Sequence, residues 1–456
     1  MTADAAFVAY HRFGLGPRPD DMERAPADMR AALVAELAPA ALRLAGDLPD
    51  SRAAYGTLRD DQMARAERRA EAAPAMAEGA AGMAMKNGPS AAHRLYRAEL
   101  AARLDRVGRA QIGFVDRLVM FWANHFAVQA SKGELVRGLA GAFEREAIRP
   151  HVLGRFSDML LAATTHPAML VSLDNVLSVG PASPAGRRRD RGLNENHARE
   201  LLELHTVGGD GGYTQDDVVA LAKILTGWSF VRDVEAEDAG RFVFEARAHE
   251  PGTQTVLGRR YAQEGRDQGE AVLRDLAGRP ETARHIALKF ARAFVADDPP
   301  AGLVERLAGR FTDTGGDLAS LARALVEDEE AWTGRDKFKT PQLFIWSALR
   351  ALDAEVEPQM VIGALQALGQ PLWDPPSPEG FHDDRATWLA PDAITTRLEI
   401  AERLAGRAAI ADEPADWAQA IFGATLSADT ATAIARAESE RQAFVLALMS
   451  PEFQRS

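Results

Sequence analysis

Apolar residues recur at intervals of three and four along most of this chain, and this feature restricts its fold more than any other. The interval places them on one side of an α-helix, where they can pack against a core. Most of them are Ala and Leu, which lose little side-chain freedom in a helix. The sequence therefore predicts a mainly α fold, a globular bundle of many helices.

One segment departs from this pattern, RFVFEARAHEPGTQTVLGRRY at residues 241–261. Phe242 and Phe244 alternate along the chain, which is typical of a strand. A Pro-Gly pair follows that suits a turn, and residues 255–257 resume the apolar pattern. We expect one small β-hairpin, or a pair of short strands, inserted in the bundle around 241–261.

The 456 residues are enough for about three structural units. We divide them into an N-terminal helical region (1–72), a flexible linker rich in Ala, Gly and Met (73–92), a central helical core (93–335) and a C-terminal helical region (336–456). The segment FVDRLVMFWANHFAV at 114–128 is the most apolar and aromatic of the core, so we expect it near the centre. A Pro-rich segment at 373–384 is expected to pack back over the body.

Charge and cysteine content narrow the class of protein. The formal net charge of -13 argues against a nucleic-acid partner, and we interpret the basic run GRRRDRG at 186–192 as a solvated loop. The absence of cysteine excludes disulfides, thiolate-bound zinc and a cysteine nucleophile. No apolar run is long enough for a membrane span, and the first residues lack an export signal, so we expect a soluble protein, cytoplasmic unless it is exported with a partner.

The stretch LNENHARELLELHTVGGDGGYTQDDV at 193–218 combines the leucines of a buried helix with many polar side chains. His197, Glu200 and Glu203 share one face at helical spacing, whereas His205 points elsewhere on an ideal helix. The helix should end at two glycines, and the next should begin at Thr214, with Asp217 completing a capping box. The polar row is either a solvated face or a buried network.

A metal site here would need ligands from other segments, and the chain offers His125 in FWANHF and His249 beside the hairpin turn. Imidazole and carboxylate together suit zinc, iron or manganese. The alternative for each histidine is a hydrogen-bonded core residue, and His205, in a last helical turn, can cap free carbonyls. The motifs of phosphate loops, dinucleotide-binding turns, HExxH metalloproteases and GxSxG hydrolases are all missing.

Several stretches together resemble the bacterial family named domain of unknown function 1800. They are RFGLGP (12–17), FWANHF (121–126), HPAMLVSLDN (166–175), the stretch at 193–218, ILTGW (224–228) and HEPGTQTVLGRRY (249–261). The resemblance covers nearly the whole chain. It supports Trp122, Asn124, His125, Asp174, Asn175, Asn194, Glu195, Asn196, Arg199, Glu200, Glu203, His205, Trp228 and His249, but not His197.

The resemblance implies a context rather than a reaction. Relatives are often encoded beside a second family, domain of unknown function 1501, whose members resemble alkaline phosphatases and sulfatases and often carry twin-arginine export signals. A protein of that family is therefore the expected partner. Relatives also often have Asp where this chain has Glu250.

Two hypotheses follow. In the first, the protein is a metal-dependent hydrolase in which a divalent ion is held by His125, Glu200, His205 and His249. Glu203 or Asp174 then acts as general base, and Arg199 orients a carboxylate or binds an anionic group. In the second, it is a non-catalytic binding or assembly protein whose polar network fixes helix packing. The first predicts that the histidines converge, and the second that each bonds to a nearby carbonyl or carboxylate.

Overall fold

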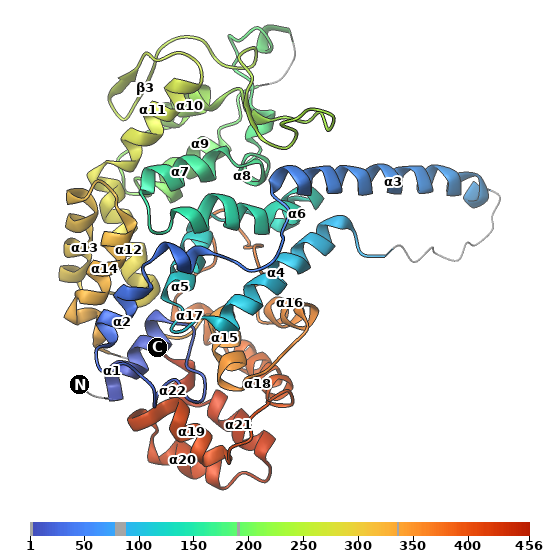
Figure 1. Cartoon of the computed structure of the whole chain (residues 1–456). Helices are drawn as coiled ribbons and strands as arrows, with labels where there is room; N and C mark the ends of the chain where they lie inside the picture. Colours follow the sequence, from blue (N-terminus) through green and yellow to red (C-terminus); the bar gives the residue numbers. More distant parts are fainter. Residues whose placement is uncertain (1–2, 78–87, 189–191, 335–336) are drawn as a thin grey trace.

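The computed structural model describes residues 3–77, 88–188, 192–334 and 337–456, and it confirms the mainly α fold (Figure 1). The α-helices of the first half are α1 Ala3–Val8, α2 Met29–Glu36, α3 Ser51–Ala77, α4 Ala91–Arg109, α5 Phe114–His125, α6 Glu134–Phe143, α7 Phe156–Thr165, α8 Pro167–Ser172, α9 Asn196–Glu200 and α10 Gln215–Leu225. Those of the second half are α11 Arg266–Ala277, α12 Pro280–Phe294, α13 Ala301–Asp313, α14 Leu318–Glu327, α15 Pro341–Ala351, α16 Pro358–Ala367, α17 Arg385–Trp388, α18 Pro391–Ala405, α19 Pro414–Phe422, α20 Ala428–Ala435, α21 Glu440–Leu448 and α22 Pro451–Gln454.

The strand segment lies where the sequence predicts it, but its strands pair differently from one hairpin. Strand β2 (Phe242–Phe244) pairs antiparallel with β1 (Trp228–Phe230), and β3 (Gln254–Val256) pairs with β4 (Arg259–Tyr261). The turn between β3 and β4 consists of Leu257 and Gly258, both with positive φ, at 49° and 75°. Two successive residues with positive φ match the twist of a two-residue hairpin turn. Strand β3 therefore pairs with β4, which follows this turn, and not with β2.

Helix α5 lies in the interior, as its composition predicts. Leu118, Trp122 and His125 are each only 1% exposed and share one face of the helix. Arg117, Phe121 and Asn124 follow another face, which borders a cavity. One continuous hydrophobic core joins α5 to helices of both the N-terminal and the C-terminal regions.

The Pro-rich segment packs back across α5, as predicted. We call residues 370–384, between α16 and α17, the strap. The Asn124 amide donates to Phe381 O at 2.9 Å and accepts from Phe381 N at 2.7 Å. The preceding Gly380 has φ +91°, and a Cβ there would lie 2.4 Å from Asn124 O. Only glycine therefore fits at this contact.

Two other predicted segments are described in part. Helix α3 continues to Ala77 and projects from the body (Figure 1), while residues 78–87 of the predicted linker lie outside the described residues. Of the basic run, Arg187 and Arg188 are exposed and residues 189–191 are likewise not described. No helix in the described part of the chain has the length and apolar character to cross a membrane.

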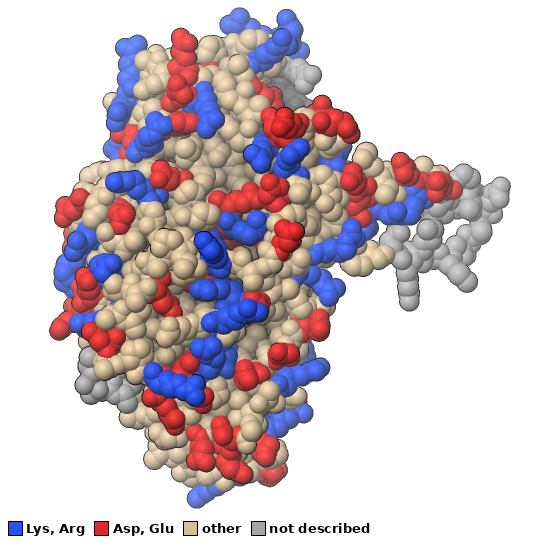
Figure 2. Space-filling model, in the orientation of Figure 1, with Lys and Arg blue, Asp and Glu red and all other residues tan. Residues whose placement is uncertain are grey.

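Acidic and basic side chains are interspersed over most of the face drawn in Figure 2. Many form ion pairs one helical turn apart, such as Arg266 and Arg274 on either side of Glu270 in α11. Exposed pairs of this kind stabilise a helix only slightly, by about 0.3–0.5 kcal/mol each. The fold therefore depends mainly on buried contacts.

One such contact fixes the start of α5. The Glu36 carboxylate at the end of α2 accepts hydrogen bonds from the backbone N–H groups of Ile112, Gly113 and Phe114, at 2.7–3.2 Å. These amides have no partner within the helix, and a negative charge there also favours the helix dipole. Glu36 thus ties the position of the central helix to a segment far away in sequence.

We expect the substitution Glu36→Ala to lower the free energy of unfolding by about 1–3 kcal/mol, because it leaves three amides without their charged acceptor. Glu36→Gln should lose less, since the amide oxygen still accepts. Urea denaturation followed by circular dichroism measures both. An unchanged midpoint for Glu36→Ala would show that water replaces the carboxylate at no penalty.

Candidate functional site

The structure brings His125 and His205 together. His125 ends α5, and His205 ends a π-helical turn, Leu201–His205, that continues α9. Their ring centroids are 5.9 Å apart, both side chains are 1% exposed, and His125 Nε2 donates to His205 O at 3.2 Å. Because the helix widens into a π-turn here, side-chain directions on an ideal α-helix do not apply.

A third histidine that we did not predict joins them. His285 of α12 has its ring centroid 6.3 Å from that of His125, and its Nε2 donates to Leu204 O at 3.0 Å. Gly208 approaches this ring so closely that a Cβ would lie 2.7 Å from His285 Nδ1. We call His125, His205 and His285 the histidine cluster. The local signal for His285 in the sequence was its i, i+4 spacing from Lys289 on an amphipathic helix.

His249 occupies a separate environment. Its Nδ1 donates to Thr226 O at 2.9 Å, and its ring packs against Phe244 at 5.1 Å between centroids. The next residue, Glu250, is buried, and its carboxylate accepts from Ala182 N at 2.7 Å. Glu250 thereby closes the loop after residue 180, which gives this carboxylate a structural role.

The other predicted site residues lie nearer the surface, either in the stretch at 193–218, which we call the motif, or in the segment before it. Arg199 donates to Glu195 and Gln215 and is 40% exposed. Asp174 lies 3.4 Å from Lys132 in an exposed ion pair. These positions let both residues hold charge near water.

The two glutamates of the motif differ from each other. Glu203 accepts a hydrogen bond from the Tyr213 hydroxyl at 3.1 Å. Glu200 is half-buried, and burial raises its pKa, with a further contribution from the neighbouring charge of Glu203. Glu200 therefore takes up a proton more readily than an exposed glutamate does.

The predicted metal ligands do not form one centre. Among the described residues, no group of three or more His, Asp or Glu side chains is placed to hold a metal ion. Within the motif and the end of α5, the buried ring nitrogens His125 Nδ1, His205 Nε2 and both nitrogens of His197 nevertheless lack a hydrogen-bond partner. The structure thus provides an adjacent pair of imidazoles, without the further donors that a tetrahedral site requires.

Amide side chains near the motif also bond to the backbone. Asn196 Nδ2 donates to Leu173 O at 3.3 Å, and Asn175 Nδ2 donates to Leu225 O at 3.2 Å and Trp228 O at 2.9 Å. Both amides satisfy carbonyls at ends of helices and strands, which otherwise lack a partner. They hold α8, α10 and β1 together around the motif.

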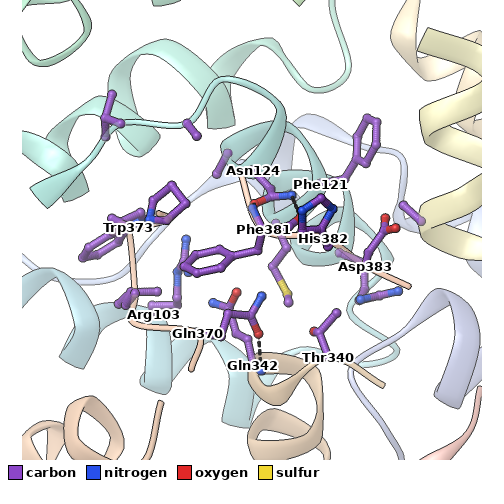
Figure 3. A pocket seen from close by; sticks show the side chains of 18 of the residues that line it. Arg103, Phe121, Asn124, Thr340, Gln342, Gln370, Trp373, Phe381, His382 and Asp383 are labelled. Atoms are coloured by element: carbon purple, nitrogen blue, oxygen red, sulfur yellow. Dashed lines mark hydrogen bonds between the residues drawn. The ribbon is translucent and has the colours of Figure 1, made fainter. Parts of the chain in front are cut away.

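The other face of α5 borders a cavity of about 90 Å³ beneath the strap (Figure 3). Side chains from α4, α5, α12, the start of α15 and the strap line it. The sequence does not predict this site, because its walls come from segments more than 200 residues apart. The only local signal is Arg117, a cation within the apolar segment of α5.

The fold and these contacts define a mainly α protein built around a buried network of histidine and amide side chains. The chain matches the family model described as "Protein of unknown function (DUF1800)" over residues 8–455, so it belongs to that family. Among curated proteins and solved structures, none matches this chain.

The buried histidines make stability depend on pH. Burial lowers the pKa of His197 to about 3 and, with the charge of Lys289, that of His285 to about 4; the pKa values of His125 and His205 are also lowered by burial. In the unfolded chain these histidines bind protons near pH 6.5, whereas in the folded chain their side chains stay neutral at that pH. The unfolded state therefore binds more protons as the pH falls, and stability is lost below about pH 6.5.

We expect His197→Leu to reduce this loss, by up to about 1.4 kcal/mol per pH unit between about pH 6 and pH 4. Near neutral pH its free energy of unfolding should equal or exceed that of the wild type, because neither His197 ring nitrogen forms a hydrogen bond. Urea denaturation over a pH series measures both effects. The exposed His93→Gln serves as control, and identical pH profiles for wild type and His197→Leu would refute the assignment.

Proposed function

We propose that this protein is a non-catalytic binding protein in which the histidine and amide side chains of the motif form a structural network. One observation carries the proposal. His125, His249 and His285 each donate to a backbone carbonyl, of His205, Thr226 and Leu204 respectively. Hydrogen bonds from histidines to carbonyls are what an assembly role requires.

The energetics support a structural network. A buried carbonyl without a donor costs about 1–3 kcal/mol, so each of these hydrogen bonds prevents a loss of that size. The carbonyls of Leu204 and His205 lie in the π-helical turn, where they are bonded by histidines from α12 and α5. The network thus fixes how three helices pack, with no reacting group required.

Metal-dependent hydrolysis is the second candidate, and one observation favours it. His125 Nδ1 and His205 Nε2 are buried and lack hydrogen-bond partners, and free imidazole nitrogens of this kind are metal donors. His125 even keeps its other nitrogen bonded to a carbonyl, as metal-bound histidines often do. Against it, His249 is committed to Thr226 O, and the described carboxylates do not complete the set.

The binding proposal accommodates the partner expected from the resemblance, a protein of the domain of unknown function 1501 family. It does not depend on that partner. A ligand or protein that occupies a surface or cavity of the folded chain suffices, since the motif itself acts only by holding the helices in place.

Two substitutions at His125 separate the candidates. His125→Gln keeps a donor for His205 O, whereas His125→Ala removes the donor and leaves a void. We expect His125→Ala to cost about 3–5 kcal/mol in unfolding free energy and His125→Gln clearly less. Elemental analysis by inductively coupled plasma mass spectrometry, after expression with zinc, iron and manganese supplied, should find no stoichiometric metal in the wild type.

The same two variants also define the result that would contradict the structural proposal. A metal site needs the imidazole itself, so near-stoichiometric metal in the wild type that is lost in a folded His125→Gln variant would establish the metal candidate and reject the structural one. Denaturation curves recorded on the same samples confirm that the variants are folded.

A further inference from the structure

We propose that the cavity beneath the strap binds a small organic monoanion, with Arg117 recognising its carboxylate. This inference rests on the proposed binding function and assigns it a ligand class. The ligand would place an apolar body among aromatic side chains and its charge at Arg117.

The walls of the cavity combine apolar and polar surfaces. Phe121, Phe294 and Trp373 supply aromatic faces, and Met120 adds a flexible apolar side chain. The volume of about 90 Å³ accommodates several water-sized groups. Figure 3 shows polar side chains beside these apolar ones, including Gln342 and Gln370, which are joined by a hydrogen bond from Gln342 N to Gln370 Oε1 at 2.8 Å.

Arg117 is the charged group that points to an anion. It is 8% exposed, one of its Nη atoms donates to Arg12 O at 3.3 Å, and its guanidinium lies 5.2 Å from the centroid of the Phe294 ring. Its Nε has no hydrogen-bond partner, and among the described residues no carboxylate forms an ion pair with it. A buried guanidinium without a counter-ion destabilises the folded protein unless an anion binds beside it.

Two other buried arginines have a carboxylate partner. Arg103, which lines the same cavity, pairs with the buried Glu144. Arg350 pairs with Asp21 at 3.2 Å and donates to four backbone carbonyls. Arg117 makes a single hydrogen bond by comparison, so most of its five donors remain available for a ligand.

A second donor beside the cavity lacks an acceptor. Gln342 Nε2 is buried and makes no hydrogen bond. Gln342 and Thr340 belong to the first turn of α15, so the positive end of that helix dipole also borders the cavity. An anion bound here would satisfy Arg117, accept from Gln342 and gain from the dipole.

The charge balance favours a monoanion over a dianion. The pKa of Arg117 is lowered to about 10, chiefly by burial. Asp383 of the strap also lines the cavity, and its negative charge opposes this lowering. Asp383 is paired with Lys337 at 3.5 Å, so Arg117 keeps one positive charge that a monoanion balances, whereas a phosphate dianion would exceed it and be repelled by Asp383. A carboxylate also matches the planar guanidinium with two parallel hydrogen bonds.

Benzoate and its neutral isostere benzamide test the assignment by isothermal titration calorimetry on the full chain. We expect benzoate to bind the wild type about ten to a hundred times more tightly than benzamide, the range of a charge-assisted hydrogen bond. Arg117→Met should abolish this preference. Phenyl phosphate, a dianion that also carries a phenyl ring, should bind more weakly than benzoate.

Arg117→Met replaces an unpaired buried charge by an apolar side chain of similar length, so it should fold, which circular dichroism checks. The exposed Arg274→Met, which leaves the cavity unchanged, is the matched control and should bind like the wild type. Gln342→Leu provides a second variant within the cavity and should weaken benzoate binding with little effect on benzamide.

Equal binding of benzoate and benzamide by the wild type, or no binding of either at millimolar concentration, would overturn the inference. So would unchanged benzoate binding in folded Arg117→Met. These failures leave the metal content untouched, whereas stoichiometric metal at His125 would reject the proposed function and leave any benzoate binding intact.

Discussion

The burial of α5 is the constraint on which the rest of this structure depends. A helix at the centre of a protein must find partners for its polar side chains and for the free amides of its first turn among other buried groups. Most of the partners come from distant parts of the chain. They are Glu36 for the first turn, Arg106 and Arg149 for Asp116, the strap for Asn124, and the π-helical turn for His125.

This arrangement separates two roles on one helix. The face with Trp122 and His125 meets the motif, where hydrogen bonds to carbonyls hold helices together. The face with Arg117 and Asn124 meets the strap and borders the cavity. On the first face His125 Nε2 bonds within the protein, while Arg117 on the second face keeps donors that have no partner among the described residues.

Much of the fold was predictable because its signals are local. The apolar spacing gave the helical class, the composition of 114–128 indicated the central helix, and Thr214 with Asp217 forms the predicted capping box. The strand pairing was not predictable, because the positive φ values of Leu257 and Gly258 decide it. The π-helical turn before His205 also leaves no periodic trace, so the direction of that side chain could not be read from spacing.

The site was less predictable for a similar reason. A pattern on one helix shows which residues share a face, but the identity of the atoms across from them depends on packing between distant segments. His249 was expected beside His205 and instead bonds to Thr226 O, whereas His285 joins the cluster from α12. Whether the predicted residues bind a metal is a question for the elemental analysis, since spacing alone could not distinguish a ligand from a donor to a carbonyl.

The strap has a course that is set largely by its main chain. Asn124 binds both the N–H and the carbonyl of Phe381, Ala130 N donates to Trp373 O at 3.0 Å, and Gln129 Nε2 donates to Pro375 O at 3.2 Å. Some of its side chains also anchor it, since Trp373 Nε1 donates to Glu144 at 2.9 Å and Asp374 accepts from Ser131 N at 2.8 Å, while Gly380 is required for its lack of a side chain. Phe381 lines the cavity but is hydrogen-bonded through its main chain, so replacement of its side chain would change what the protein selects while leaving the path of the strap as it is.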